Sequence, residues 1–248
     1  MQLRTVKVTR YVTPLREGGS LPAIVEADDD GLYVLKFRGS GQGKKALIAE
    51  LLGGEIGRVL GLRVPEIVFA ELDPVLAMTE PDPEIQELMK ASAGLNLALD
   101  YLPGSIMYDP ALKPPDAGLA SRIVWFDAFI ANVDRTARNA NMLLWHNEIW
   151  LIDHGASLYF HHNWTTFAEN ARNPFPMVKD HILRPFAENV SDADKELSGR
   201  LSKQKLSDII SLIPDAWLDE PEAEKAAYLD FFMQRLASPR DFVTEAAK

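Results

Sequence analysis

The sequence predicts an α+β fold with two lobes: a β-rich N-terminal lobe over residues 1–99 and a mainly helical C-terminal lobe over residues 100–248. Segments with the apolar alternation typical of strands are concentrated before residue 100, whereas helix-like patterns dominate from residue 119 onward. A proline-rich stretch over residues 109–116 separates the two parts. We expect a cleft between two such lobes, which is a common place for a small ligand.

The predicted N-terminal lobe contains a sheet and one principal helix. The turn sequence Asp28-Asp29-Asp30-Gly31 lies between two apolar runs and predicts a hairpin. The principal helix is expected over residues 44–60, because Gly61 supplies a stop signal. A second, acidic helical stretch covers residues 80–92. Strands are expected at residues 3–12, 21–26, 32–37, 64–72 and 96–102.

The predicted C-terminal lobe is mostly helical but contains one pair of strands, around residues 141–145 and 148–152. The last part of the chain, residues 192–246, shows three helical patterns. These patterns are broken near Pro214, Pro221 and Pro239, because proline cannot continue a helix from within.

Composition narrows the class of protein. The net charge of −10 argues against a general nucleic-acid binder, which normally carries a basic stripe. The absence of cysteine excludes disulfides and thiolate metal sites. The first eight residues lack the apolar core of a signal peptide, and no run approaches the ~18 apolar residues of a membrane span. From the sequence we expect a cytoplasmic protein without a membrane span.

Three polar residues carry the strongest chemical signal. Asp134 is followed by Asn139 five positions later, and Asp153 ends an apolar strand. An aspartate can accept the proton of an attacking hydroxyl, while an asparagine and a second aspartate can hold the divalent metal that bridges nucleotide phosphates. The two acids are separated by 153 − 134 = 19 residues, about what a short hairpin needs to bring them together. This pattern predicts metal-assisted phosphoryl transfer.

Lys36 is the candidate for contacting the nucleotide phosphates. It lies on a predicted strand that is followed by a helix, and a glutamate on that helix would hold the lysine in place. Two glutamates compete for this role. A helical wheel places Glu55 within the apolar face, where an unpaired carboxylate is costly to bury, and places Glu50 on a different side.

Two glycine-rich segments are candidates for the loop that covers the phosphates. Gly39 to Gly43 does not have the spacing of a Walker A motif, and it follows the lysine strand instead of preceding it. Gly18, Gly19 and Ser20 precede that strand, which is where a kinase places its phosphate-covering loop.

With these residues assembled, the chain resembles the HipA-like kinase family, whose fold is related to the protein kinases and the phosphatidylinositol kinases. The resemblance therefore implies a two-lobed protein-kinase-like fold. The matching segments are Val34-Leu35-Lys36-Phe37, Ala49-Glu50 to Gly61-Leu62-Arg63-Val64-Pro65, Asn132-Val133-Asp134-Arg135 to Asn139, and Leu151-Ile152-Asp153.

The resemblance also implies an activity: binding of ATP and Mg²⁺, and transfer of a phosphoryl group to a serine or threonine of a protein. Asp134 would then be the catalytic base and Lys36 the phosphate contact, with Glu50 preferred over Glu55 as its partner. The implied metal ligands are Asn139 and Asp153, and the implied backbone contacts to adenine come from Asp100, Tyr101 and Leu102.

Two other functions use the same residues. A small-molecule or lipid kinase would place an alcohol of another kind in the cleft, and carboxylates such as Asp109 or Asp116 would favour a cationic acceptor. A nucleotide-binding pseudokinase would act as a regulator without catalysis. Retention of the lysine, the base and both metal ligands argues against the pseudokinase.

Overall fold

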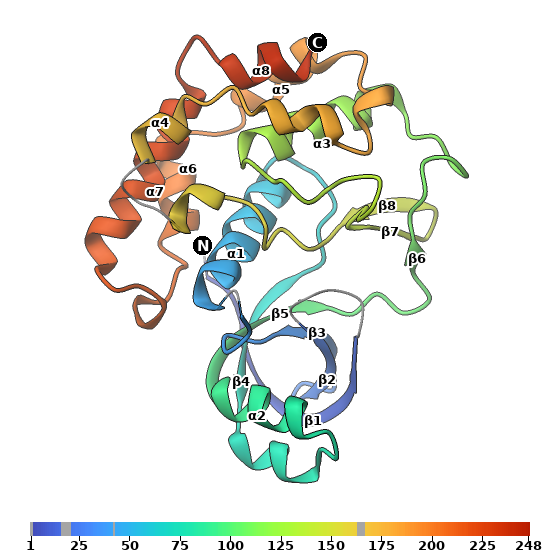
Figure 1. The fold of residues 1–248 in the computed structure, drawn as a ribbon, viewed down its shortest axis with the longest axis vertical. Helices are drawn as coiled ribbons and strands as arrows, with labels where there is room; N and C mark the ends of the chain where they lie inside the picture. Colours follow the sequence, from blue (N-terminus) through green and yellow to red (C-terminus); the bar gives the residue numbers. More distant parts are fainter. Residues whose placement is uncertain (1, 16–20, 42, 163–166) are drawn as a thin grey trace.

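The computed structural model describes residues 2–15, 21–41, 43–162 and 167–248. The described chain combines a β-rich N-terminal region with a helical C-terminal region (Figure 1). In Figure 1 the barrel of the N-terminal region is the narrow lower part, and the helices form the broad upper part. Among the described residues, no helix is long and apolar enough to span a membrane.

The N-terminal strands form a closed five-stranded barrel in the order β1-β2-β3-β5-β4. Neighbouring strands are antiparallel except at the closure, where β1 pairs with β4 in parallel. Tyr33 and Leu35 alternate into the barrel core, so Lys36 of the same strand faces outward toward the cleft. The strands are β1 (Thr5–Pro14), β2 (Ala23–Ala27), β3 (Leu32–Lys36), β4 (Ile67–Leu72) and β5 (Gly94–Asp100).

Two helical segments cover the end of the barrel that lies away from the helical part (Figure 1). They are the 3-10 helix η1 (Pro74–Thr79) and helix α2 (Pro83–Ala91), the latter within the acidic stretch expected at residues 80–92. Asp82 caps α2 by accepting a hydrogen bond from the backbone N–H of Glu84. The expected strand at residues 64–72 begins only at Ile67.

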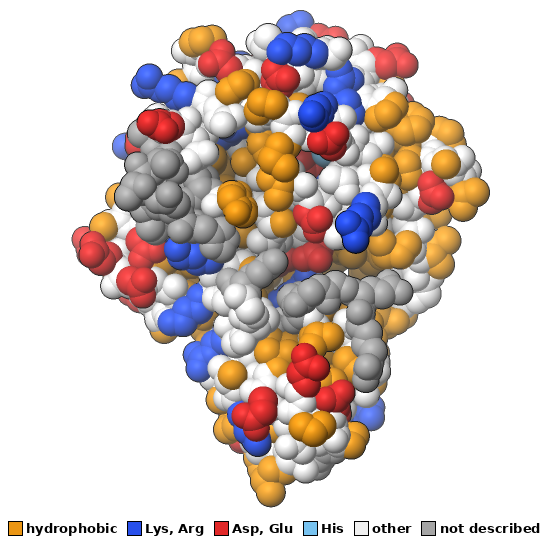
Figure 2. Space-filling view, viewed as in Figure 1, with side chains coloured by type: hydrophobic (Ala, Val, Ile, Leu, Met, Phe, Trp, Pro, Cys, Tyr) orange, Lys and Arg blue, Asp and Glu red, His pale blue; other side chains and the backbone are white. Residues whose placement is uncertain are grey.

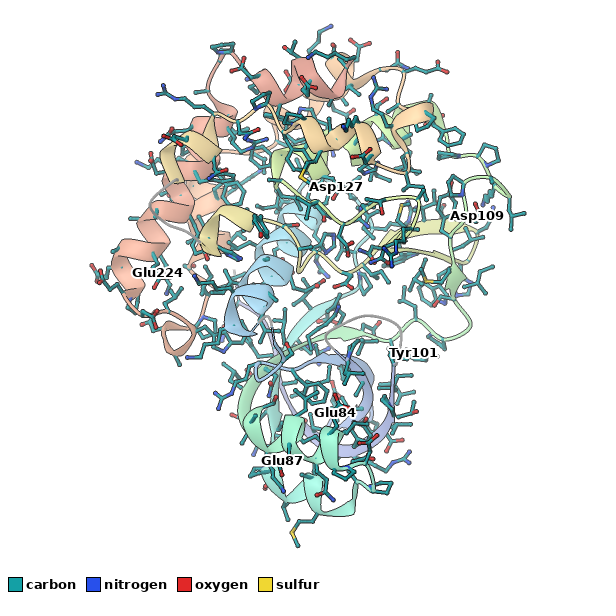
Figure 3. The ribbon with its side chains drawn as sticks, in the orientation of Figure 1. Glu84, Glu87, Tyr101, Asp109, Asp127 and Glu224 are labelled. Atoms are coloured by element: carbon teal, nitrogen blue, oxygen red, sulfur yellow. The ribbon has the colours of Figure 1, made fainter. Side chains whose placement is uncertain are left out.

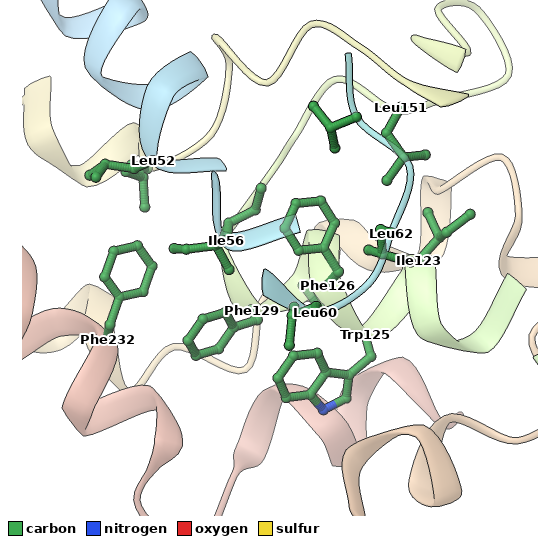
Figure 4. Packing of buried hydrophobic residues seen from close by; sticks show 14 of the residues in the cluster. Leu52, Ile56, Leu60, Leu62, Ile123, Trp125, Phe126, Phe129, Leu151 and Phe232 are labelled. Carbon is green, nitrogen blue, oxygen red and sulfur yellow. The ribbon is translucent and has the colours of Figure 1, made fainter. Parts of the chain in front are cut away.

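Helix α1 (Gly43–Val59) is the element that joins the two parts. Its residues from Leu47 to Gly57 are all buried, because barrel strands cover one side and the C-terminal helices cover the other. Leu52 and Ile56 lie among aromatic rings of the C-terminal helices (Figure 4), in a hydrophobic core that is distinct from the barrel core. The helix belongs to the first 99 residues by sequence, yet its main packing is with the C-terminal helices.

The C-terminal region is built around α3 (Ala117–Phe129), which Asp116 caps and whose last three turns are almost wholly buried. A three-stranded sheet, in the order β6-β7-β8, lies beside the cleft. Its strands are β6 (Ile106–Met107), β7 (Met142–Trp145) and β8 (Glu148–Leu151). The remaining helices are α4 (Phe167–Ala171), α5 (Val190–Ser198), α6 (Lys203–Ile210), α7 (Pro221–Leu236) and α8 (Asp241–Ala246).

The prediction of three helical patterns in residues 192–246 was wrong, because four helices occupy this part of the chain. The first pattern is divided into α5 and α6. Gly199 ends α5, and Ser202 starts α6 by accepting a hydrogen bond from the backbone N–H of Lys205. Both are local signals that the apolar periodicity alone did not contain.

The close approach of α1 to the strand-ending loop after β8 generates the first prediction. A Cβ atom on Gly53 would lie 2.8 Å from Cβ of His154. We expect Gly53→Ala to destabilise the fold by about 1–3 kcal/mol through this overpacking, although alanine favours a helix over glycine by ~1 kcal/mol. Gly199→Ala is the control, since its Cβ would meet nothing closer than 3.9 Å. Urea unfolding measures both, and equal midpoints would contradict the prediction.

Candidate active site

A cleft between the barrel and the helical region has a volume of about 1370 Å³. Figure 2 shows a hollow at this level of the molecule, with acidic side chains exposed in it. Several lining residues were predicted as site residues from the sequence: Lys36, Asp100, Tyr101, Leu102, Asp134, Asn139 and Asp153. Residues distant in the sequence are therefore brought together in one place.

Lys36 bridges two acids that come from different parts of the fold. Its Nζ lies 2.7 Å from Oδ1 of Asp153, and 3.7 Å from Oε2 of Glu50 on α1. Burial alone would lower the pKa of Lys36, but the charges of Glu50 and Asp153 outweigh it and raise the pKa above its usual value. The ammonium is therefore charged at neutral pH and faces the cleft.

Glu50, not Glu55, lies beside Lys36. Burial opposes ionisation of Glu50, but Lys36 and a hydrogen bond with His154 (Nδ1 to Oε1, 3.3 Å) prevail and lower its pKa to about 2. Glu55 lies 3.5 Å from Arg58 on the same helix, and its burial raises its pKa. The helical wheel pointed to Glu55 because it treated the helix as having one buried face, whereas α1 is buried all round over this span.

Asp134 follows α3 in a loop where two amides hold its carboxylate. Asn139 Nδ2 donates to Asp134 Oδ2 at 2.7 Å, and Asn141 Nδ2 donates to the same oxygen at 3.1 Å. Because both donors use Oδ2, Oδ1 is the oxygen left to accept a proton from a substrate. The sequence patterns assign no role to Asn141, and its role as a second holder of Asp134 comes from the structure.

The donor groups in the cleft suit a hard divalent cation. No group of three or more His, Cys, Asp or Glu side chains that could hold a metal exists among the described residues. Asn139 uses its N–H to hold Asp134, so its Oδ1 can face a metal, and Asp153 adds a carboxylate that is 41% exposed. Mg²⁺ is commonly bound by one or two protein oxygens together with substrate phosphates and water. This sparse set of oxygen donors fits such a nucleotide-dependent site.

The backbone at Asp153 has an unusual conformation, with φ at +56°. Aspartate tolerates this left-handed region better than most residues, but it still costs free energy and is retained where the surroundings enforce it. The turn directs the carboxylate away from β8 and toward Lys36.

The predicted adenine-binding segment lies where the barrel joins the helical region, and Figure 3 labels Tyr101 there. The N–H of Asp100 already donates to the carbonyl of Glu66, and that of Tyr101 donates to the carbonyl of Leu32. Within the part of the chain that the structure describes, the N–H of Leu102 has no such acceptor. Of the three predicted residues, Leu102 is therefore the one whose N–H can meet a ligand.

The two glycine-rich segments differ in what the structure says of them. Gly18, Gly19 and Ser20 lie outside the described residues. None of the described residues of the later loop lines the cleft. Its first residue, Gly39, donates a hydrogen bond to Ser92 Oγ, and a Cβ there would lie 2.8 Å from Cβ of Ala91, so this loop packs against the end of α2.

Arg138 lines the cleft close in sequence to Asp134 and Asn139, and it is exposed. The sequence patterns assign no role to this residue. A cationic side chain beside the predicted base and metal ligands adds positive charge where phosphate oxygens would lie.

A family model for HipA-like kinases matches residues 8–241 of this chain. The chain belongs to the HipA-like kinase family. Two solved structures with a similar fold are also kinases. The Helicobacter pylori proinflammatory kinase CtkA matches with a TM-score of 0.61 and 14% identity, over 98% of each chain. The Golgi casein kinase, solved with Mn and ADP bound, matches with a TM-score of 0.57 and 10% identity, over 98% of this chain and 73% of that one.

No curated protein is similar enough in sequence to count as a relative. The likeness to the two solved kinases, at 14% and 10% identity, concerns the fold. The family match supports a phosphotransferase.

The depressed pKa of Glu50 generates a prediction about acid stability. Its folded-state pKa of about 2 lies below the ordinary value of 4.5, so its contribution to stability is complete above pH 4.5 and is lost as the pH falls toward 2. We expect Glu50→Gln to lose about 3–5 kcal/mol at pH 7, because it leaves a buried lysine with one carboxylate fewer. The variant should also lose less stability than the wild type between pH 4.5 and 2.

Urea unfolding between pH 7 and pH 2 measures both effects. Glu87→Gln is the control, because Glu87 forms only an exposed pair with Lys90, and such pairs contribute about 0–1 kcal/mol. If the free energy of unfolding falls equally in wild type and Glu50→Gln between pH 4.5 and 2, Glu50 is not held ionised in the folded protein.

Proposed function

We propose that this HipA-like kinase transfers the γ-phosphoryl group of ATP to a hydroxyl group of a protein serine or threonine. The observation that carries the proposal is the convergence of Lys36, Asp134, Asn139 and Asp153 on one cleft. These side chains come from the barrel, from the loop after α3 and from the turn after β8, and a kinase needs the same chemical types together.

Each residue is assigned a role that its contacts support. Lys36, held by Glu50, would contact the nucleotide phosphates and neutralise their charge. Leu102, at the junction of the two parts, would donate its N–H to the adenine ring. Gly18, Gly19 and Ser20 would cover the phosphates, a role that follows only from their place in the sequence.

Asn139 and Asp153 would hold Mg²⁺, which supplies positive charge to the phosphate oxygens when bound. Lys36 lies 2.7 Å from Asp153, so the lysine and the metal ligand act on the same region of the cleft. Two positive groups held there would stabilise the charge that develops on the transferred group.

The proton of the acceptor hydroxyl would go to Asp134 Oδ1. Oδ2 is fixed by Asn139 and Asn141, so the carboxylate cannot rotate freely and presents one defined oxygen. As the hydroxyl oxygen bonds to the γ-phosphorus, the bond from phosphorus to the β–γ bridging oxygen breaks and ADP leaves. Arg138 would add charge stabilisation from the side of the loop.

The size of the cleft favours a large acceptor. Its volume of about 1370 Å³ exceeds the ~300–1,000 Å³ typical of small-ligand pockets, which supports room for a nucleotide and a segment of polypeptide. A cationic small molecule would be favoured by Asp109 or Asp116 in the cleft. Asp109 instead accepts from the N–H of Ala111, Asp116 caps α3, and neither lines the cleft.

The test of this function is phosphoryl transfer by wild type and Asp134→Asn. With radiolabelled ATP and Mg²⁺, we expect transfer to itself or to an added protein to fall about 10²–10⁴-fold in the variant, because the general base is lost. Binding of ATP should persist, since Asp134 is not assigned a contact to the nucleotide. At 100 times the dissociation constant, ATP should add ~2.7 kcal/mol to the stability of both proteins.

Asp219→Asn is the matched control, since it makes the same chemical change at an exposed position outside the cleft. Transfer that survives in Asp134→Asn would refute the assigned base. If ATP and Mg²⁺ stabilise neither protein, the proposal of a nucleotide-dependent kinase fails altogether.

A further inference from the structure

A fully buried ion pair lies directly behind the predicted catalytic loop. Arg135, the residue after the predicted base, donates from Nε to Asp127 Oδ2 at 2.6 Å, and neither side chain is exposed to solvent. Burial opposes the charge on Asp127, but Arg135 and His181 outweigh it and hold its pKa far below the usual range. Asp127 lies on α3, within the helical region above the cleft (Figure 3).

Asp127 reaches the base through Asn132. The amide of Asn132 donates from Nδ2 to Asp127 Oδ1 at 2.9 Å. The other atom of that amide, Oδ1, accepts the backbone N–H of Asp134 at 3.1 Å. One side chain therefore connects the buried carboxylate to the backbone of the predicted base.

Asp127 reaches the metal aspartate through Arg135. Arg135 Nη1 donates to the carbonyl of Asn141, one of the two residues that hold the carboxylate of Asp134. The same Nη1 lies 3.4 Å from the carbonyl of Ile152, the residue before Asp153. The planar guanidinium can face a carboxylate on one edge and two carbonyl groups on another, which a lysine ammonium cannot do in the same geometry.

His181 is the third group on Asp127, and its tautomer is set by the backbone. The N–H of Leu183 donates to His181 Nδ1 at 3.0 Å, so that nitrogen must carry a lone pair. The proton of the neutral ring then lies on Nε2, which donates to Asp127 Oδ2 at 2.9 Å. The segment after Arg135 is also bound to this region, since Thr136 forms a β-bridge with His181.

We propose that Asp127 and His181 are positioning residues that set the base and the metal aspartate in one fixed relation. Asp127 is the common anchor: Asn132 connects it to Asp134, and Arg135 connects it to the strand end before Asp153. His181 fixes the orientation of the Asp127 carboxylate without touching the cleft. The proposal rests on the proposed function, in which Asp134 and Asp153 act together on one phosphoryl group.

If the Asp127–Arg135 pair only stabilises the fold, its loss has a different effect from the loss of a pair that also positions the catalytic loop. Loss of a structural pair lowers stability and leaves the turnover of the folded fraction unchanged. Loss of a positioning pair lowers kcat while leaving the KM for ATP nearly constant, since Leu102 makes no contact with Asp127, Arg135 or His181 and Lys36 is also held by Glu50. A displacement of about 1 Å in a catalytic group can cost about 100-fold in rate.

The experiment compares Asp127→Asn, His181→Phe and His181→Gln with a matched control. Asp194→Asn is that control, because Asp194 also pairs with an arginine (Arg240) and with a side chain of α3, the indole of Trp125. It makes the same chemical change in the helical region but contacts no residue of the catalytic loop. All rates are measured at a temperature where each protein is folded.

We expect kcat to fall about 100-fold in Asp127→Asn and His181→Phe, with the KM for ATP within about twofold of wild type. His181→Gln should recover most of the activity, because its amide can donate to Asp127 as the ring does. Asp194→Asn should lose thermal stability but keep its kcat. Equal kcat in His181→Phe and His181→Gln, or an equal fall in Asp194→Asn, would overturn the proposal.

Amide hydrogen exchange tests the network without relying on activity. Residues 132–141 should exchange faster in Asp127→Asn and in His181→Phe than in wild type or Asp194→Asn. Unchanged exchange there would overturn the proposal even if the protein is an active kinase. Should the wild type transfer no phosphoryl group, the proposed function fails, and the exchange result still decides whether this network holds the loop. If Asp127→Asn does not fold, the two His181 variants carry the comparison.

Discussion

The shared position of the Lys36 ammonium between Glu50 and Asp153 is the constraint on which the cleft depends. The lysine comes from the barrel, the glutamate from α1 and the aspartate from the turn after β8, so one cation joins three segments. Two carboxylates near each other would repel, and a lysine buried alone would lose its charge. The two carboxylates therefore keep Lys36 ionised, and Lys36 helps to keep Glu50 ionised. The cluster consequently combines one basic and two acidic groups before any nucleotide is bound.

Helix α1 makes this arrangement possible because it packs on both sides. Its small residues Gly53 and Gly54 let the turn at His154 and the strand β4 approach the helix axis closely. Its larger side chains are embedded in the core of the C-terminal helices (Figure 4). A helix that is buried on all sides shows little amphipathic pattern. The pattern of α1 is weak because the barrel covers one side of the helix and the C-terminal helices cover the other.

Behind the cleft, polarity is organised in layers. The layer that lines the cleft contains the half-buried residues Asp134, Asn139 and Asp153, which can meet a substrate. The buried layer contains Asp127, Arg135 and His181, which touch only the protein. Buried charges are costly unless they are paired and hydrogen-bonded, and these form a set in which each member has a partner. Burying these charged side chains costs free energy, and this cost is consistent with a need to hold the cleft residues Asp134, Asn139 and Asp153 in a fixed geometry.

Local sequence patterns were enough to predict a kinase-type chemistry and the coarse architecture. The spacing of Asp134, Asn139 and Asp153, and a lysine strand ahead of a helix, are local patterns, and local patterns survive without knowledge of the fold. The three-dimensional fold was needed to show which glutamate meets Lys36, that β1 and β4 close the barrel in parallel, and that Asp127 lies behind the loop. These are contacts between residues far apart in the chain. The energies of these contacts depend on which distant residues are buried together and which charges are paired. A helical wheel or a period-two strand pattern holds no information about either.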